Sequence, residues 1–164
     1  MVDVSVWTTI VVIGAMHYAL ALRVDDFFTG DTTYFELARS LLSHGGYGFN
    51  ARAETVMPPG FPAFMAALCL TVGCRHAVFL HAVVVCSTAG VLASYELLRR
   101  LQGRTAATVI SLLLIASPGL FLLETRMVMS DLPYMLTSLS TLLLVQRLDQ
   151  SRYSRPGPRE EGGL

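Results

Sequence analysis

Residues 77–98 read AVFLHAVVVCSTAGVLASYELL, a run of 22 residues in which Glu96 is the one formal charge. A helix of that length reaches about 33 Å, which is enough to cross the roughly 30 Å hydrocarbon core of a bilayer. We therefore expect a membrane-spanning helix here. His81, alone within the run, is expected to be a hydrogen-bonded packing residue instead of a metal ligand, and Glu96 is expected to form an interfacial ion pair with Arg99 and Arg100 one turn later.

The composition of the whole chain also indicates a membrane protein. Hydrophobic residues make up 53% of the chain and charged residues 15%, with a mean hydropathy of +0.55. A soluble domain has a charged fraction of about 25%. The formal net charge is zero and no aromatic residues interleave with the scattered arginines, so the sequence excludes a nucleic-acid partner.

Three further apolar runs fit membrane spans. They cover residues 4–22, 105–123 and 127–145, and the last is the least apolar because it contains Asp131 and Pro133. The first run follows Asp3 where a signal peptide would have basic residues, so we expect a retained span. Residues 59–73, PGFPAFMAALCLTVG, are apolar but short, and we expect them to lie along the surface or to re-enter the membrane.

Charge bias selects the topology. With four spans, the short loop that carries Arg99, Arg100 and Arg104 faces the cytoplasm, as the positive-inside rule requires. If residues 59–73 crossed as a fifth span, that loop would face outward and Asp31 and Asp131 would lie on opposite sides. We therefore predict an all-α, polytopic transmembrane bundle of about four spans in the cell membrane, with both termini cytoplasmic.

The predicted domains follow from this topology. A membrane domain covers residues 1–148, with spans at about 4–22, 77–98, 105–123 and 127–145 and an outer loop at 25–76. Residues 149–164 contain mostly Arg, Pro, Gly and Glu, so we expect a disordered cytoplasmic tail. The three cysteines lie in apolar surroundings without metal-ligand spacing, and we expect small buried hydrophobes in preference to a disulfide.

The outer loop contains the most distinctive polar segment, residues 30–62, GDTTYFELARSLLSHGGYGFNARAETVMPPGFP. Thr33 and Glu36 fit a capping box, and apolar residues then recur at helical spacing until Gly45. We expect an amphipathic helix in the headgroup plane. Asp31 precedes it, where the helix dipole favours an ionised carboxylate that can act as a general base.

Each candidate in the outer segments has a structural alternative. Asp31 also fits an ordinary structural acid at a helix N-terminus, and Tyr34 fits an aromatic anchor at the membrane interface. Asp131, at the start of a span, is costly unless it faces water, a cavity or a partner, but Arg126 and Arg75 offer it an ion pair. We expect Glu124 to be a solvated loop residue. Asp25, Asp26 and Glu54 are candidates for holding a divalent metal, although no spacing assigns a metal site.

The order of these motifs resembles the N-terminal region of the GT-C polytopic membrane glycosyltransferases, in particular the bacterial protein-mannosyltransferase-like branch that includes aminoarabinose transferases. The resemblance covers roughly residues 4–146. It rests on an acid followed by Tyr and an A-R-x-L helix, on a proline-rich closure of the loop, and on a second acid before an aromatic residue. In this chain the matching residues are Asp31, Tyr34, Ala38 and Arg39, then Pro58, Pro59 and Pro62, then Asp131, Pro133 and Tyr134.

The resemblance implies transfer of a sugar from a polyprenyl-phosphate donor to a lipid, glycan or protein acceptor on the non-cytoplasmic face. It implies catalytic roles for Asp31 and Asp131 and substrate-binding roles for Tyr34, Arg75 and Arg126. Members of the family have eight or more spans, so we expect this chain to supply part of such an enzyme. The alternative is a non-catalytic remnant or accessory subunit that keeps the first half of the fold.

Overall fold

The computed structural model describes residues 4–21, 29–43, 46–49, 52–53 and 56–153. This part of the chain is helical except for one small hairpin. The elements in chain order are α1 (Val4–Ala21), α2 (Thr29–Leu42), β1 (Gly48–Phe49), β2 (Arg52–Ala53), α3 (Gly60–Thr71), α4 (His76–Gln102), α5 (Arg104–Ile115), α6 (Pro118–Arg126) and α7 (Asp131–Tyr153).

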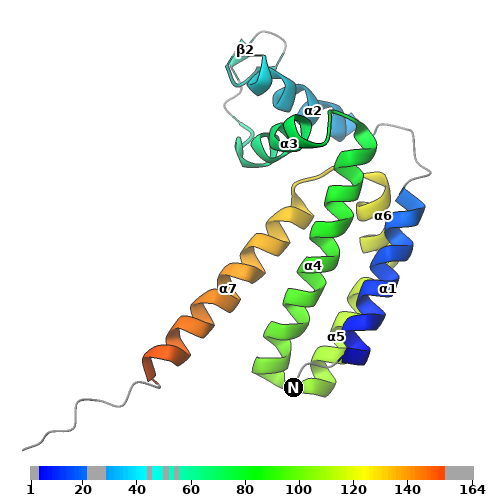
Figure 1. The fold of residues 1–164 in the computed structure, drawn as a ribbon, viewed down its shortest axis with the longest axis vertical. Coiled ribbons are helices and arrows are strands. Elements are labelled where there is room, and N and C mark those ends of the chain that lie inside the picture. Colours follow the sequence, from blue (N-terminus) through cyan, green and yellow to red (C-terminus); the bar gives the residue numbers. More distant parts are fainter. Residues whose placement is uncertain (1–3, 22–28, 44–45, 50–51, 54–55, 154–164) are drawn as a thin grey trace, which may run out of the picture.

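Helix α4 is the central element of a helical bundle, and α1, α5, α6 and α7 all pack against it (Figure 1). Its buried residues recur along one side and include Phe79, Leu80, Val83, Val84 and Val91. The expected ion pairs at its C-terminal end are present, since Glu96 Oε1 lies 2.9 Å from Arg99 Nη2 and 2.8 Å from Arg100 Nη2. This prediction is therefore confirmed.

Small residues let two neighbours approach α4 closely. A Cβ atom at Gly14 of α1 would lie 2.7 Å from Thr88 Cγ2, and one at Gly90 of α4 would lie 2.6 Å from Met135 Cε of α7. Both distances are shorter than real Cβ contacts allow. Helices that pack in lipid depend on such small residues, because van der Waals contact between close backbones replaces the hydrophobic effect.

The predicted span at residues 105–123 forms two helices. Helices α5 and α6 meet at an angle of 51° around Ala116 and Ser117, and Pro118 is the first residue of α6. Proline removes a backbone donor and cannot continue α5, whereas it fits the first turn of a new helix. The Ser117 side chain caps α6 by accepting a hydrogen bond from the backbone N–H of Leu120, at 3.1 Å.

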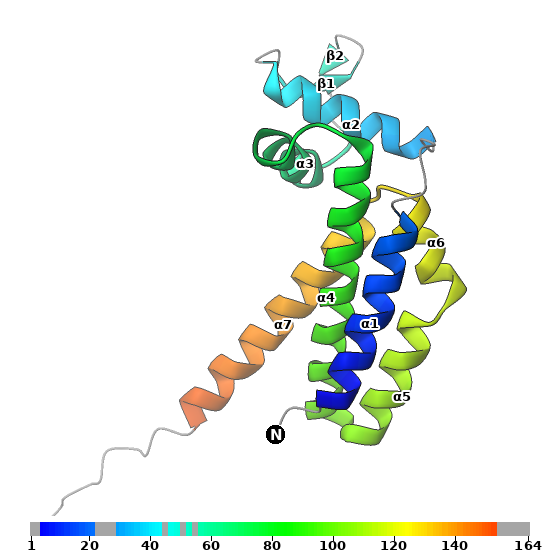
Figure 2. The same ribbon diagram turned by 45° about the vertical axis from the view of Figure 1, so that its right-hand side comes forward.

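The outer segment forms a layer across one end of the bundle. Figures 1 and 2 show α2 and α3 lying side by side above the ends of α1 and α4, with the hairpin beyond them. The hairpin pairs Gly48 with Ala53 and Phe49 with Arg52. Aromatic contacts connect the layer to the bundle, because the Phe35 ring of α2 packs edge-on against Phe79 of α4 at 5.7 Å between centroids.

The opposite end of the bundle carries the start of α1, the α4–α5 turn and the end of α7 (Figures 1 and 2). The turn passes through Gly103, whose φ of +87° suits glycine and few other residues. Arg99, Arg100 and Arg104 flank this turn, so the arginine cluster and the α2–α3 layer lie at opposite ends. A single orientation in a membrane can therefore place the arginines inside and the layer outside.

Among the described residues, two helices, α1 and α4, are long and apolar enough to cross a membrane, and α5 with α6 makes a third candidate as one bent span. Helix α7 is not among these candidates. It is long, with 23 residues, but it starts at Asp131 and includes Thr137, Thr141 and Arg147. The all-helical bundle is thus shown, while four spans stay a prediction.

Three local expectations were wrong. Helix α2 begins at Thr29, so Thr33 lies inside the helix and does not cap it. Helix α7 continues to Tyr153, so residues 149–153 are not part of a disordered tail, and residues 154–164 lie outside the described residues. The third concerns the cysteines, because Cys69 and Cys74 form a disulfide.

We predict that Gly14→Ala weakens the α1–α4 crossing, because the new methyl group has no room beside Thr88. Overpacking of this kind costs about 1–3 kcal/mol. Thermal unfolding of the purified protein in detergent should show a lower Tm for this variant. Gly119→Ala is the matched control, since a Cβ atom there meets nothing within 4 Å. Equal Tm values for the two variants would contradict the close crossing.

Candidate functional site

The α2–α3 end of the bundle brings together segments that are far apart in the sequence. Tyr34 of α2 is the residue that joins them. Its ring packs edge-on against Phe61 of α3, with 5.0 Å between the centroids. Its hydroxyl lies 3.3 Å from Ser130 Oγ, which immediately precedes α7. The predicted outer loop and the segment that opens α7 therefore meet at the same end of the bundle.

The two candidate acids lie on the segments that this contact joins. Asp31 is the third residue of α2 and precedes Tyr34 by three residues. Asp131 follows Ser130 directly, as the first residue of α7, and its side chain is exposed. Both acids lie in the first turn of a helix. The five-span arrangement would have separated them, and in this fold they share one end.

Two candidate cations are also at this end. Arg75 precedes α4 and Arg126 is the last residue of α6, and both side chains are exposed. Among the residues that the structure describes, no ion pair joins either arginine to Asp131. The alternative of an ion pair between an arginine and Asp131 is therefore not seen in the described part of the chain.

All three candidate metal ligands, Asp25, Asp26 and Glu54, lie outside the described residues, in the ranges 22–28 and 54–55. Within the described part of the chain, no group of three or more His, Cys, Asp or Glu side chains is arranged to hold a metal ion.

The disulfide between Cys69 and Cys74 bears on the redox compartment that the α2–α3 end faces. It joins the last turn of α3 to the loop before α4. Disulfides persist in oxidising compartments and are rare in the cytosol. The arginine cluster predicts an extracytoplasmic location for this end, and a disulfide there is compatible with that prediction. Apolar neighbours alone gave no signal of this pairing in the sequence.

A second polar cluster lies inside the bundle, below the α2–α3 layer, and the sequence did not reveal it. Glu124 of α6 is fully buried, with 0% of its surface exposed. Its Oε2 lies 2.7 Å from Nδ1 of His17 on α1, and the Ser87 hydroxyl of α4 donates a hydrogen bond to its Oε1. We call His17, Ser87 and Glu124 the buried network. The sequence-based expectation that Glu124 is a solvated loop residue was therefore wrong.

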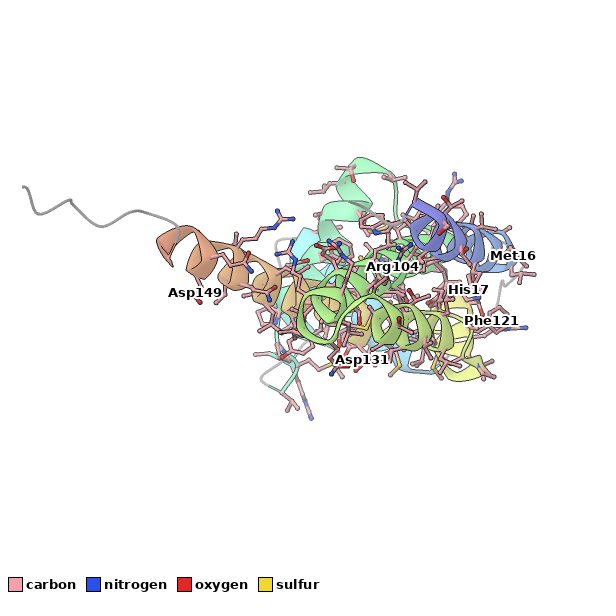
Figure 3. The ribbon with its side chains drawn as sticks, turned by 90° about the horizontal axis from the view of Figure 1, so that it is seen from below. Met16, His17, Arg104, Phe121, Asp131 and Asp149 are labelled. Atoms are coloured by element: carbon pink, nitrogen blue, oxygen red, sulfur yellow. A yellow bond between two sulfur atoms is a disulfide. The ribbon has the colours of Figure 1, made fainter. Side chains whose placement is uncertain are left out.

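The neighbours of the network are apolar. The His17 ring packs edge-on against Phe121, one turn before Glu124, with 5.1 Å between the centroids (Figure 3). The His17 side chain keeps 9% of its surface exposed and Glu124 keeps none. An ionised carboxylate in such surroundings is costly unless it is paired and hydrogen-bonded, and both of its oxygens have partners here.

The order of contacts in the network does not suit nucleophilic catalysis. In a serine nucleophile triad, the imidazole lies between the hydroxyl and the carboxylate and removes the hydroxyl proton. Here the carboxylate lies between the hydroxyl and the imidazole, so His17 has no contact with Ser87 Oγ. The network connects three helices, and its chemistry is that of a buried hydrogen-bonded contact between them.

One sequence signal could have pointed to this network. His17 lies within a predicted span, and an ionisable residue in a span normally has a partner inside the bundle. Glu124 follows the apolar run PGLFLL directly, so its position at the end of a span was ambiguous. His81, the other histidine in a predicted span, packs on Tyr18 with 4.2 Å between ring centroids, and its buried Nε2 has no hydrogen-bond partner among the described residues.

Comparison with known protein families, with curated proteins and with solved structures finds no match to this chain. Any assignment of function therefore depends on the residues and their geometry.

We predict that only Cys86 reacts with a maleimide polymer in the folded, oxidised protein after detergent solubilisation, and that all three cysteines react after reduction and unfolding. In intact cells, a membrane-impermeant reductant should release Cys69 and Cys74 for labelling if their end of the bundle faces outward, as the arginine cluster predicts. Gel mobility reports the number of added polymers. Labelling of this pair only after the cells are opened would contradict the orientation.

Proposed function

We propose that this chain belongs to a GT-C-type membrane glycosyltransferase and that its α2–α3 end forms the acceptor side of the site. The observation that carries the proposal is the contact between Tyr34 and Ser130, which joins the segments that contain Asp31 and Asp131. Exposed arginines at the same end and a disulfide suited to an oxidising compartment support it.

The proposed reaction is the transfer of a sugar from polyprenyl phosphate to an acceptor hydroxyl. Asp31 accepts the proton of that hydroxyl as the oxygen attacks the anomeric carbon. The bond between this carbon and the phosphate oxygen breaks, and polyprenyl phosphate leaves with the bonding electron pair. Asp131 orients the acceptor, while Arg75 and Arg126 stabilise the charge that develops on the phosphate.

The donor and the acceptor would approach by different routes. The polyprenyl chain is apolar and stays in the bilayer, beside the candidate spans α1 and α4. Its phosphate reaches the end of the bundle where Arg75 precedes α4. The acceptor hydroxyl comes from the aqueous side, where Asp131 is exposed. With the donor arriving from the bilayer and the acceptor from water, Asp31 on α2 would lie between the two substrates.

A second candidate function, a non-catalytic accessory subunit, is supported by a groove at the other end. Helix α7 diverges from α4 (Figure 2), and a groove of about 520 Å³ lies between them. Its lining is mainly aliphatic and includes Leu97, Leu101, Leu142 and Val145. Such a surface suits contact with another membrane helix, so this chain would complete a site in a larger assembly.

The test is sugar transfer in membranes from cells that lack the gene and are complemented with the full chain. The readout is the release of polyprenyl phosphate from a radiolabelled lipid-linked sugar. Asp31→Asn should lower the rate by about 10²–10⁴-fold if Asp31 is the general base. Asp149→Asn is the matched control, because this exposed acid lies in the last part of α7. It should leave the rate unchanged.

Two other outcomes would change the assignment. A full rate with Asp31→Asn would contradict the base role. If complementation restores no transfer although the protein is present in the membrane, the accessory function is favoured over catalysis.

A further inference from the structure

Helix α6 is short, so its position in the bundle has to be fixed by contacts with other helices. It has nine residues, and it is separated from α5 by the break at Ala116 and Ser117. A helix of this length is marginal by itself and depends on tertiary contacts. Leu120 and Thr125 are buried and Phe121 contacts His17, but apolar contacts of this kind tolerate sliding and rotation.

Glu124 supplies a contact that does not tolerate sliding. Its two carboxylate oxygens are held from two different helices, Oε2 by His17 of α1 and Oε1 by Ser87 of α4. A rotation or a one-turn shift of α6 would separate the carboxylate from both partners inside an apolar core. Such a separation is strongly unfavourable, because it leaves an unpartnered carboxyl group buried among apolar side chains. The buried network therefore selects one position of α6 among those that its apolar residues allow.

The position of α6 is transmitted to the α2–α3 end through a short connection. Five residues lie between Glu124 and Ser130, the residue in contact with Tyr34. Within this connection, Arg126 ends α6, Val128 is buried in the core, and Asp131 then begins α7. Movement of α6 therefore moves the segment that contains Ser130 and Asp131 relative to α2.

We infer that Glu124 is a positioning residue: through His17 and Ser87 it fixes α6, and through α6 it holds Ser130 and Asp131 opposite Tyr34 of α2. The significance for catalysis rests on the proposed function, but the positional effect exists whatever the reaction is. Glu124 itself does not touch a substrate, since it is fully buried.

The test measures the separation of the two segments without any substrate. Tyr34→Cys and Ser130→Cys are introduced together with Cys86→Ser, so that two free thiols remain beside the Cys69–Cys74 disulfide. A short bismaleimide joins the thiols, and the rate of cross-linking is measured in nanodiscs. We expect Glu124→Ala to slow cross-linking by about tenfold, which is a typical magnitude for energetic coupling between two sites in a protein.

The swapped pair His17→Glu with Glu124→His is expected to recover most of the rate, because it restores a histidine–carboxyl contact between the same two helices. Val91→Ala is the control for general destabilisation. Val91 is fully buried on α4 and forms no part of the network, so this variant should lower the Tm and leave the cross-linking rate unchanged.

The inference is overturned if Glu124→Ala cross-links as fast as the parent protein, or if Val91→Ala slows the reaction as much as Glu124→Ala does. If Glu124→Ala does not fold, Ser87→Ala and Glu124→Gln replace it, and an unchanged rate in both would overturn the inference. Failure of the transfer assay bears on the proposed function alone, because cross-linking requires neither donor nor acceptor.

Discussion

A carboxylate inside an apolar bundle must find partners for both of its oxygens, and the arrangement of helices around Glu124 meets that requirement. His17 on α1 and Ser87 on α4 hold the side chain, so α6 is fixed against two helices that are distant in the sequence. Apolar contacts supply most of the stabilisation, because they are many. The buried network fixes the position of α6, because the free energy rises steeply when the buried carboxyl group loses its hydrogen-bond partners.

The same bundle also positions the α2–α3 layer at one of its ends. Helix α3 has 12 residues, which is too short to cross a bilayer, and it lies beside α2 across the end of the bundle. The contacts of Tyr34 with Phe61 and Ser130 connect this layer to the beginning of α7. The proposed glycosyl transfer and the proposed accessory role use different surfaces of one scaffold, the α2–α3 end in the first case and the α4–α7 groove in the second.

Much of the fold was predictable because a long apolar run in a membrane forms a helix, which satisfies its own backbone hydrogen bonds. The runs at residues 4–22 and 77–98 correspond to α1 and α4, and the spacing of Glu96, Arg99 and Arg100 correctly predicted the ion pairs. The wrong predictions share a physical cause, since each depended on three-dimensional surroundings. Glu124 was taken for a loop residue because neither His17 nor Ser87 is near it in sequence, and Cys69 and Cys74 were taken for small hydrophobes because their neighbours are apolar.

The sequence by itself determined the class of protein, the all-helical architecture and the end at which the arginines gather, because hydropathy and charge act on each segment independently of its neighbours. It also singled out Asp31 and Asp131 as acids at the ends of apolar segments. Only the tertiary structure decided that their segments meet, that α5 and α6 are two helices, and that a buried acid connects α6 to α1 and α4. Contacts of this kind depend on residues as far apart as 107 positions, so no local pattern encodes them.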